Sequence, residues 1–115
     1  MDKTYRNELR RLFLIQGMPE PLTPASSHLQ IFDNYIENTR IRLRSVRVPQ
    51  TKQWTWILQQ RFPLEDFAQW KIAEIYLNEA EHQVFESFEG REIRKNRYFL
   101  DFNERIIEID VYLGR

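Results

Sequence analysis

The charges near the C-terminal end of the sequence are spaced in a way that suits phosphate and metal chemistry. Lys95 and Arg97 are two residues apart, and so are Glu108 and Asp110. Side chains at every second position of a β-strand share one face. Arg and Lys bind phosphate oxygens, whereas carboxylates hold Mg²⁺ or Mn²⁺. Two such strands side by side would therefore present both kinds of group on one surface.

The remaining charges are segregated along the chain. Six basic residues and no acidic one lie within residues 40–61, whereas residues 65–89 hold seven acidic residues and one basic residue; the net charge of the chain is zero. In the basic segment, Arg42 and Arg44 alternate with Ile41 and Leu43. Such patches either pair within the fold or form two halves of a site for a polyanion and a metal ion.

These side chains need strands to position them, and most of the sequence is typical of strands. Residues 17–27, with three prolines and two serines, indicate an ordered loop, and Asn38-Thr39 indicates a turn. Residues 8–15 fit a strand or a helix equally well. The other predicted strands are residues 28–36, 40–48, 52–62 and 70–77, followed by a helix and a closing hairpin. This order predicts the α+β class, with an antiparallel, strongly curved sheet or barrel of about seven strands.

The one predicted helix begins after Leu77. Asn78 suits the N-cap position and Glu81 completes a capping box, while Gly90 suits the C-terminal cap. An apolar stripe along this segment predicts the face that joins the core; it consists of Ala80, Val84, Phe85 and Phe88.

The closing hairpin has a predictable register. If a two-residue turn is centred on Asn103-Glu104, paired residue numbers add up to 207. The charged side of the hairpin then pairs Arg97 with Asp110, Lys95 with Tyr112 and Phe99 with Glu108. The other side is apolar, and we expect it to pack on the helix stripe. The charged side is either a solvated surface or, if the sheet curls, the lining of an interior that needs water or a ligand.

At these residues the chain resembles the CYTH family, whose fold is the triphosphate tunnel of class IV adenylate cyclases, thiamine triphosphatases and inorganic triphosphatases. The resemblance is carried by Lys95-x-Arg97-Tyr98 followed by Glu108-Ile109-Asp110-x-Tyr112-x-Gly114. It extends over roughly residues 5 to 115, with an R-x-R pair at Arg42 and Arg44 and a carboxylate at Glu74.

The resemblance implies a function and a set of site residues. The implied phosphate ligands are Arg42, Arg44, Lys95 and Arg97, and the implied ligands of Mg²⁺ or Mn²⁺ are Glu8, Glu74, Glu108 and Asp110. The implied activity is metal-dependent hydrolysis of tripolyphosphate or of a nucleoside or thiamine triphosphate, although no catalytic residue is assigned. Asp110 would either hold metal or orient Arg97.

The chain also departs from the family pattern. In the first-strand E-x-E-x-K signature only Glu8 is kept, with Arg11 as a replacement for the lysine. Ile72 stands in place of one glutamate, and a further lysine is replaced by Gln59, Gln60 or Arg61. The family's last strand is expected to be missing from this single domain of residues 1–115. These departures favour an alternative, a polyphosphate-binding module without turnover, or a fragment completed by a partner or a second copy at an open sheet edge.

Composition limits the other function classes. Cysteine is absent, which excludes disulfides, thiolate metal sites and cysteine nucleophiles. The charged N-terminal residues and the lack of a long apolar run predict a cytoplasmic protein without a membrane segment. Trp54 and Trp56 among basic residues leave a third hypothesis, RNA binding, which zero net charge disfavours.

Overall fold

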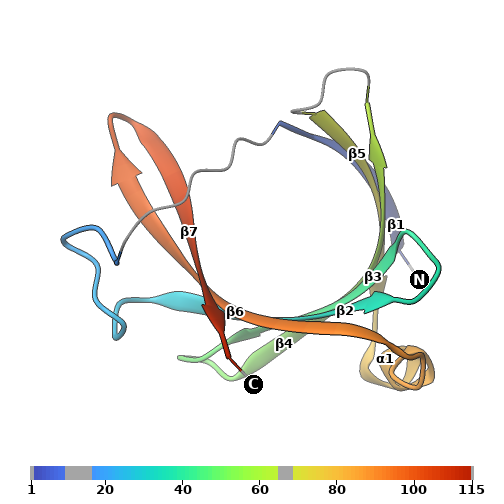
Figure 1. Cartoon of the computed structure of the whole chain (residues 1–115). Coiled ribbons are helices and arrows are strands. Elements are labelled where there is room, and N and C mark those ends of the chain that lie inside the picture. The colour runs from blue at the N-terminus through green and yellow to red at the C-terminus, as the bar shows by residue number, and fades with distance from the viewer. Residues whose placement is uncertain (1, 10–16, 65–68, 115) are drawn as a thin grey trace.

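The computed structural model describes residues 2–9, 17–64 and 69–114, and for residues 2–9 it describes the backbone alone. The described strands form one antiparallel sheet in the order β1-β5-β4-β3-β2-β6-β7. Their bounds are β1 Asp2–Leu9, β2 His28–Ile36, β3 Ile41–Val48, β4 Gln53–Pro63, β5 Gln69–Leu77, β6 Gly90–Phe102 and β7 Arg105–Leu113, with the helix α1 at Glu79–Phe85. The sheet curls into an open half-barrel with α1 outside it (Figure 1). The α+β class and the strong curvature are thus confirmed.

The register of the closing hairpin is as predicted. Arg97 lies opposite Asp110, and the two central residues of the turn, Asn103 and Glu104, have φ angles of 48° and 63°. Both angles lie in the left-handed region that a two-residue hairpin of type I′ requires. Because side chains alternate along a strand, this register fixes which hairpin residues share a face.

The first strand differs from its prediction. β1 spans Asp2–Leu9 and pairs with β5 so that Thr4 lies opposite Glu74, whereas the prediction placed an element at residues 8–15. Residues 10–15 of that element lie outside the described residues. The sequence of β1 is too polar to be read as a strand, and such a sequence is tolerated because an edge strand is paired on one side only.

The helix begins as predicted but does not join the core. Asn78 and Glu81 form the capping box, yet Val84 is 66 % exposed and Phe88 is 51 % exposed. The prediction that the stripe of Ala80, Val84, Phe85 and Phe88 is core was therefore wrong. Among the described residues this helix of seven residues contacts the sheet mainly at β4 and β5, and most of its surface faces solvent. Gly90 begins β6 and does not cap the helix, and a Cβ atom there would collide with Asn34 Oδ1 and Tyr35 O.

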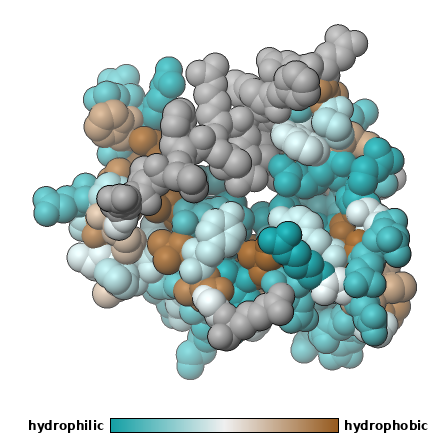
Figure 2. Space-filling view, in the orientation of Figure 1, coloured by the Kyte–Doolittle hydropathy of each residue, from teal (hydrophilic) through white to brown (hydrophobic). Residues whose placement is uncertain are grey.

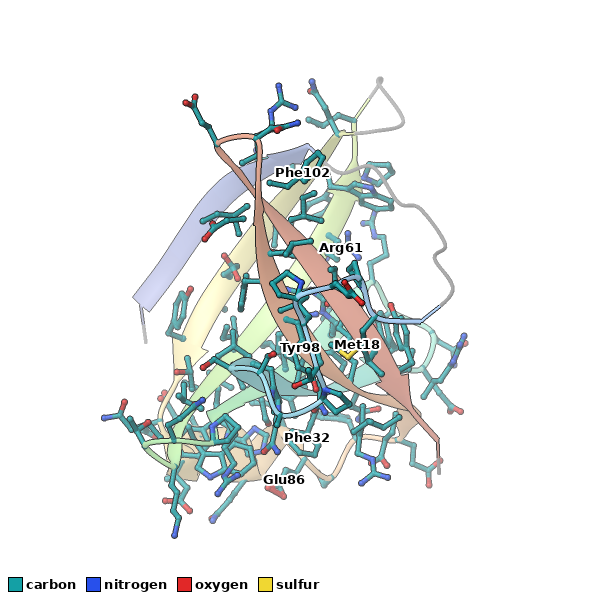
Figure 3. The ribbon with its side chains drawn as sticks, turned by 90° about the vertical axis from the view of Figure 1, so that its left-hand side faces the viewer. Met18, Phe32, Arg61, Glu86, Tyr98 and Phe102 are labelled. Atoms are coloured by element: carbon teal, nitrogen blue, oxygen red, sulfur yellow. The ribbon has the colours of Figure 1, made fainter. Side chains whose placement is uncertain are left out.

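The apolar side of the hairpin packs under a loop instead of under the helix, which corrects the second packing prediction. Tyr98 is 2 % exposed; its hydroxyl donates to Pro24 O at 2.9 Å, and its ring lies 4.8 Å from that of His28. Figure 3 faces this hairpin, with Tyr98 about midway along it and Phe102 close to its turn. Within the described residues, no helix has the length and apolar character needed to cross a membrane.

Candidate functional site

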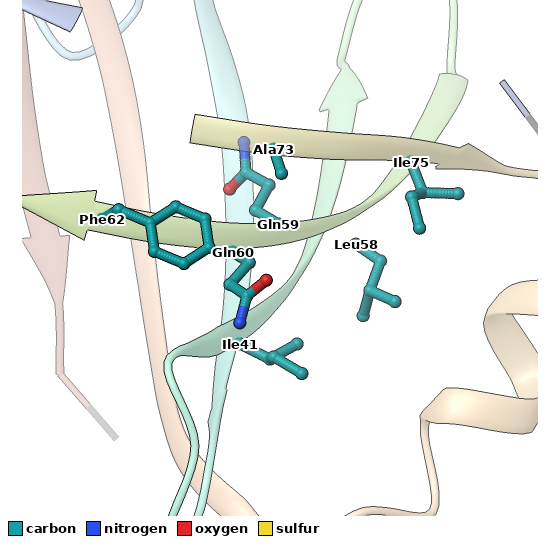
Figure 4. A pocket seen from close by; sticks show the side chains of 7 residues that line it. All are labelled: Ile41, Leu58, Gln59, Gln60, Phe62, Ala73 and Ile75. Carbon is teal, nitrogen blue, oxygen red and sulfur yellow. The ribbon is translucent and has the colours of Figure 1, made fainter. Parts of the chain in front are cut away.

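The two faces of the curled sheet are assigned by what covers them. The His82 ring of α1 stacks on Trp56 at 5.8 Å, and α1 lies outside the curl in Figure 1, so Trp56 belongs to the convex face. Residues that alternate with it point inward. Gln59 and Gln60 accordingly leave β4 on opposite sides (Figure 4). The strand registers then place the four predicted phosphate ligands, Arg42, Arg44, Lys95 and Arg97, on the concave face.

The concave face is polar and buried. Many side chains at the centre of the view in Figure 2 are hydrophilic. Seven polar or charged residues are buried in the described part of the chain, and all but Ser45 lie on this face: Asp33, Arg42, Arg44, Gln59, Glu74 and Lys95. Of the two interpretations of the charged hairpin side, the solvated surface is therefore excluded for Lys95, which is 4 % exposed.

Arg44 is neutralised within the sheet. Its Nε and Nη2 donate to Asp33 Oδ1 and Oδ2 at 2.8 and 2.9 Å, forming a bidentate pair between β3 and β2. Sequence reasoning did not assign a role to Asp33. The signal was present, because a turn centred on Asn38-Thr39 makes paired residue numbers add up to 77, and Asp33 and Arg44 meet that condition.

Arg42 has no carboxylate among its hydrogen-bond partners in the described residues. Its Nε donates to Gln59 Oε1 at 2.7 Å, and its Nη1 donates to the Tyr35 hydroxyl at 3.3 Å. Gln59 in turn donates to Glu74 Oε2 at 2.7 Å. Burial, together with the nearby charge of Arg44, lowers the pKa of Arg42. A guanidinium that is 4 % exposed and bonded to neutral groups is therefore held at an electrostatic cost.

Lys95, Arg97 and Asp110 form a second cluster at the hairpin. Arg97 donates to both Asp110 oxygens at 2.8 and 3.0 Å, and Lys95 Nζ lies 3.0 Å from Asp110 Oδ2. Burial opposes ionisation of Asp110, but the two cations outweigh it and lower its pKa to about 2. Burial lowers the pKa of Lys95 despite Asp110, whereas the pKa of Arg97 is raised because its carboxylate partners outweigh burial.

The predicted metal ligands are not gathered at one point. Glu74 lies on β5 and Glu108 on β7, five positions apart in the sheet order. The backbone of Glu8 pairs with Trp70, four residues or about 13 Å along the strand from the level of Glu74, and its side chain lies outside the described part. No cluster of three His, Asp or Glu residues placed to hold a metal ion occurs in the described ranges.

Among the predicted metal ligands whose side chains are described, Glu108 is the most accessible. Its side chain is 55 % exposed, and its Oε2 lies 3.5 Å from Arg97 Nε. Mg²⁺ commonly keeps several waters and binds through one or two carboxylates plus substrate phosphates. The chemical type and exposure of Glu108 therefore fit such a metal, and Asp110 is the orienting partner of Arg97 and Lys95 in this arrangement.

The cations step across the sheet along one diagonal. Arg42 and Arg44 lie on β3 at the levels of Tyr35 and Asp33 of β2, whereas Lys95 and Arg97 lie on β6 at the levels of Ile31 and Leu29. Each step along the strands covers about 7 Å. A row of cations with this spacing can hold an extended anion with several phosphate groups more readily than a single compact anion.

Of the three residues considered as replacements for a lysine on β4, Gln59 and Arg61 lie on the concave face and Gln60 lines a pocket of about 180 Å³ on the convex face. Ile72, which replaces a glutamate of the family pattern, is fully buried. Arg11 lies outside the described residues. Comparison of the sequence with models of protein families and with curated proteins, and of the structure with solved structures, finds no significant match.

Proposed function

We propose that the concave face binds a linear triphosphate, either inorganic tripolyphosphate or the triphosphate group of a nucleotide or thiamine, together with Mg²⁺ or Mn²⁺. The proposal follows the resemblance to the CYTH family and gives the concave cations the roles expected there. The main support for the proposal is Arg42. Its guanidinium is buried and its hydrogen-bond partners are the neutral groups of Gln59 and Tyr35, so an anion would stabilise it.

The other cations extend the same surface. Lys95 and Arg97 share Asp110, and Arg97 also lies 3.5 Å from Glu108, so a divalent ion that takes Glu108 would leave this cluster with one positive charge in excess. Arg44 is balanced by Asp33 and serves to hold the row in place. A triphosphate along the diagonal would offset the excess charge at both ends, and a divalent ion at Glu108 would bridge a phosphate to the open side of the sheet.

Binding is the part of this function that the geometry supports best. Hydrolysis needs a metal or base that positions water, and Asp110 is already occupied by Arg97 and Lys95. Metal-dependent release of phosphate from tripolyphosphate, ATP or thiamine triphosphate is the assay that separates an active triphosphatase from a binding module.

Thermal unfolding with tripolyphosphate tests the binding itself. At a concentration 100 times the Kd, a ligand stabilises the folded state by about 2.7 kcal/mol, which for a chain of this size raises the Tm by on the order of 10 °C. Arg42→Met should abolish most of this rise, because it removes a ligand contact; the Tm of the free protein then reflects the balance between the buried charge removed and the hydrogen bonds lost to Gln59 and Tyr35.

The matched control is Arg47→Met. Arg47 lies on the same strand but on the convex face, where it donates to Gln30. Its substitution should leave the rise in Tm intact, and sodium sulfate at equal ionic strength should not reproduce that rise. The proposal is wrong if tripolyphosphate does not raise the Tm, or if Arg42→Met responds to it as the unaltered protein does.

A second candidate function, RNA binding, is favoured by one observation on the convex face. Trp54 is 41 % exposed, and its ring lies parallel to that of Trp56 at 6.4 Å, with interplanar angle 2°. Exposed aromatic rings stack on unpaired bases at about 1–3 kcal/mol per base. Trp54→Ala should then weaken binding of single-stranded RNA and leave the response to tripolyphosphate unchanged.

A further inference from the structure

The strand β7 is an outer edge of the sheet among the described strands. Its one neighbour among them is β6, so within the described residues its other side offers unpaired backbone groups. Edge strands are often protected by lysine or other charged side chains, by proline, by a bulge or by inward-pointing charges. Of these, β7 has the charged residues Arg105, Glu108 and Asp110, and Asp110 points to the concave side. The sequence of β7, RIIEIDVYL, has no lysine or proline, and its pairing with β6 is continuous over nine residues.

This edge also exposes apolar side chains. Tyr112 is 61 % exposed and Leu113 is 43 % exposed, next to each other near the end of the strand. Large exposed apolar residues gathered on one element mark an interaction surface more often than a solvent-facing one. Another β-strand added at this edge would form hydrogen bonds with the unpaired backbone groups of β7 and would also cover these apolar side chains.

We infer that two copies of this chain pair through their β7 strands, antiparallel, around a two-fold axis at Val111. A two-fold axis perpendicular to the sheet keeps the concave faces of both copies on the same side. Odd-numbered residues of β7 therefore lie opposite odd-numbered residues of the other copy, and even-numbered opposite even-numbered. Zero net charge means that no long-range repulsion opposes the approach of two copies.

Charge disfavours several registers. Centring the pair on Glu108 or Asp110 places that carboxylate opposite its own copy, and centring it on Ile109 places Glu108 opposite Asp110; like charges directly opposite are destabilising. A pair centred on Ile107 places the charged Arg105 opposite the buried Ile109. The register centred on Val111 avoids all of these contacts.

The favoured register also matches apolar residues. On the convex side Val111 meets its own copy and Ile109 meets Leu113, while on the concave side Asp110 meets Tyr112. Asp110 remains neutralised by its own Lys95 and Arg97 in this arrangement. The concave faces of the two copies become neighbours across the continuous sheet.

Light scattering coupled to size exclusion measures the assembly. The full chain of 14.2 kDa should elute with a mass near 2 × 14.2 = 28.4 kDa at tens of micromolar and shift toward the monomer on dilution. Val111→Lys should give a folded monomer by circular dichroism. The control Val84→Lys, which changes an exposed valine on α1, should stay dimeric. A monomeric unaltered chain, or a dimeric Val111→Lys chain, overturns the inference.

The absence of cysteine allows a test of the register itself. Val111→Cys should form a disulfide-linked dimer under mild oxidation, because the two Cα atoms would face each other at the 4.5–5.5 Å of an antiparallel pair. Leu113→Cys should not, because its two copies would be separated by four residues, or about 13 Å. Cross-linking of Leu113→Cys, or its failure in Val111→Cys, overturns the register even if Val111→Lys unfolds the chain.

Discussion

Gln59 lies between Arg42 and Glu74 and is hydrogen-bonded to both, with 2.7 Å from Arg42 Nε to Gln59 Oε1 and 2.7 Å from Gln59 Nε2 to Glu74 Oε2. Its amide fits only one way, with its oxygen toward the guanidinium and its nitrogen toward the carboxylate. A neutral residue thus spaces a buried cation from a buried anion. Arg42 keeps its charge available to an incoming anion, because no carboxylate of the described residues holds it directly.

Gln59→Met should destabilise the protein by about 2–4 kcal/mol. It removes two buried hydrogen bonds, so that Arg42 and Glu74 each lose one partner. Urea unfolding measures the change in the free energy of unfolding. Gln60→Met, at the next position on the convex face, is the control and should change it by less than about 1 kcal/mol, since methionine suits the mostly apolar pocket there. Equal effects of the two substitutions would contradict the role given to Gln59.

The Asp110 cluster should make the protein sensitive to acid. The pKa of Asp110 is lowered from 3.8 to about 2, so its contribution is complete above pH 4 and is lost as the pH falls toward 2. A shift of this size corresponds to about 2 kcal/mol. Asp110→Asn should lower the free energy of unfolding at pH 7 and flatten its decline between pH 4 and pH 2.

The control is Asp101→Asn, on an exposed residue of the same hairpin. It should leave both the stability at pH 7 and the acid limb unchanged. Asp110→Asn could instead lose stability in acid as steeply as the unaltered protein does. The loss of stability at acid pH would then come from other carboxylates, and the two cations would not be stabilising the charge of Asp110.

The sequence predicts local structure well where a turn or a helix cap of a few residues determines it. The turn at Asn103-Glu104 predicted the register of the last hairpin, and the capping box at Asn78 predicted where α1 begins. The same pairing arithmetic at Asn38-Thr39 would have predicted the pair of Asp33 with Arg44. In each case a short turn or cap fixes the positions of residues that lie near it.

Packing partners were harder to predict, because periodicity identifies an apolar face but not what covers it. Val84 and Phe88 have the spacing of a core stripe, yet α1 is too short to bury them against the sheet. Tyr98 is covered by the loop at Pro24, 74 residues earlier in the chain. The interior position of Lys95 likewise depends on the curl of the whole sheet, which no single strand encodes.

Binding of triphosphate should take up protons at alkaline pH. Burial lowers the pKa of Lys95 below 10.5, so between that lowered pKa and 10.5 the unfolded chain binds more protons and stability rises with pH. A bound polyanion favours the charged ammonium and raises its pKa again. Titration calorimetry at a series of pH values below 10.5, in two buffers of different ionisation enthalpy, should show uptake by the unaltered protein and by Lys71→Met, an exposed control on β5, but not by Lys95→Met. Equal uptake by all three proteins would assign the proton elsewhere.

Glu108 should make the binding of triphosphate depend on metal. Glu108→Gln removes a half-exposed carboxylate and should weaken the Mn²⁺ affinity of the triphosphate complex by at least ~10-fold, because the neutral amide is a poorer ligand. Without metal the same variant should bind tripolyphosphate as tightly as the unaltered protein or more tightly, since a negative charge beside Arg97 is gone. Glu104→Gln, at the exposed turn, is the control. The rise in Tm on adding Mn²⁺ at fixed tripolyphosphate measures the effect, and an undiminished rise in Glu108→Gln would remove Glu108 from the metal site.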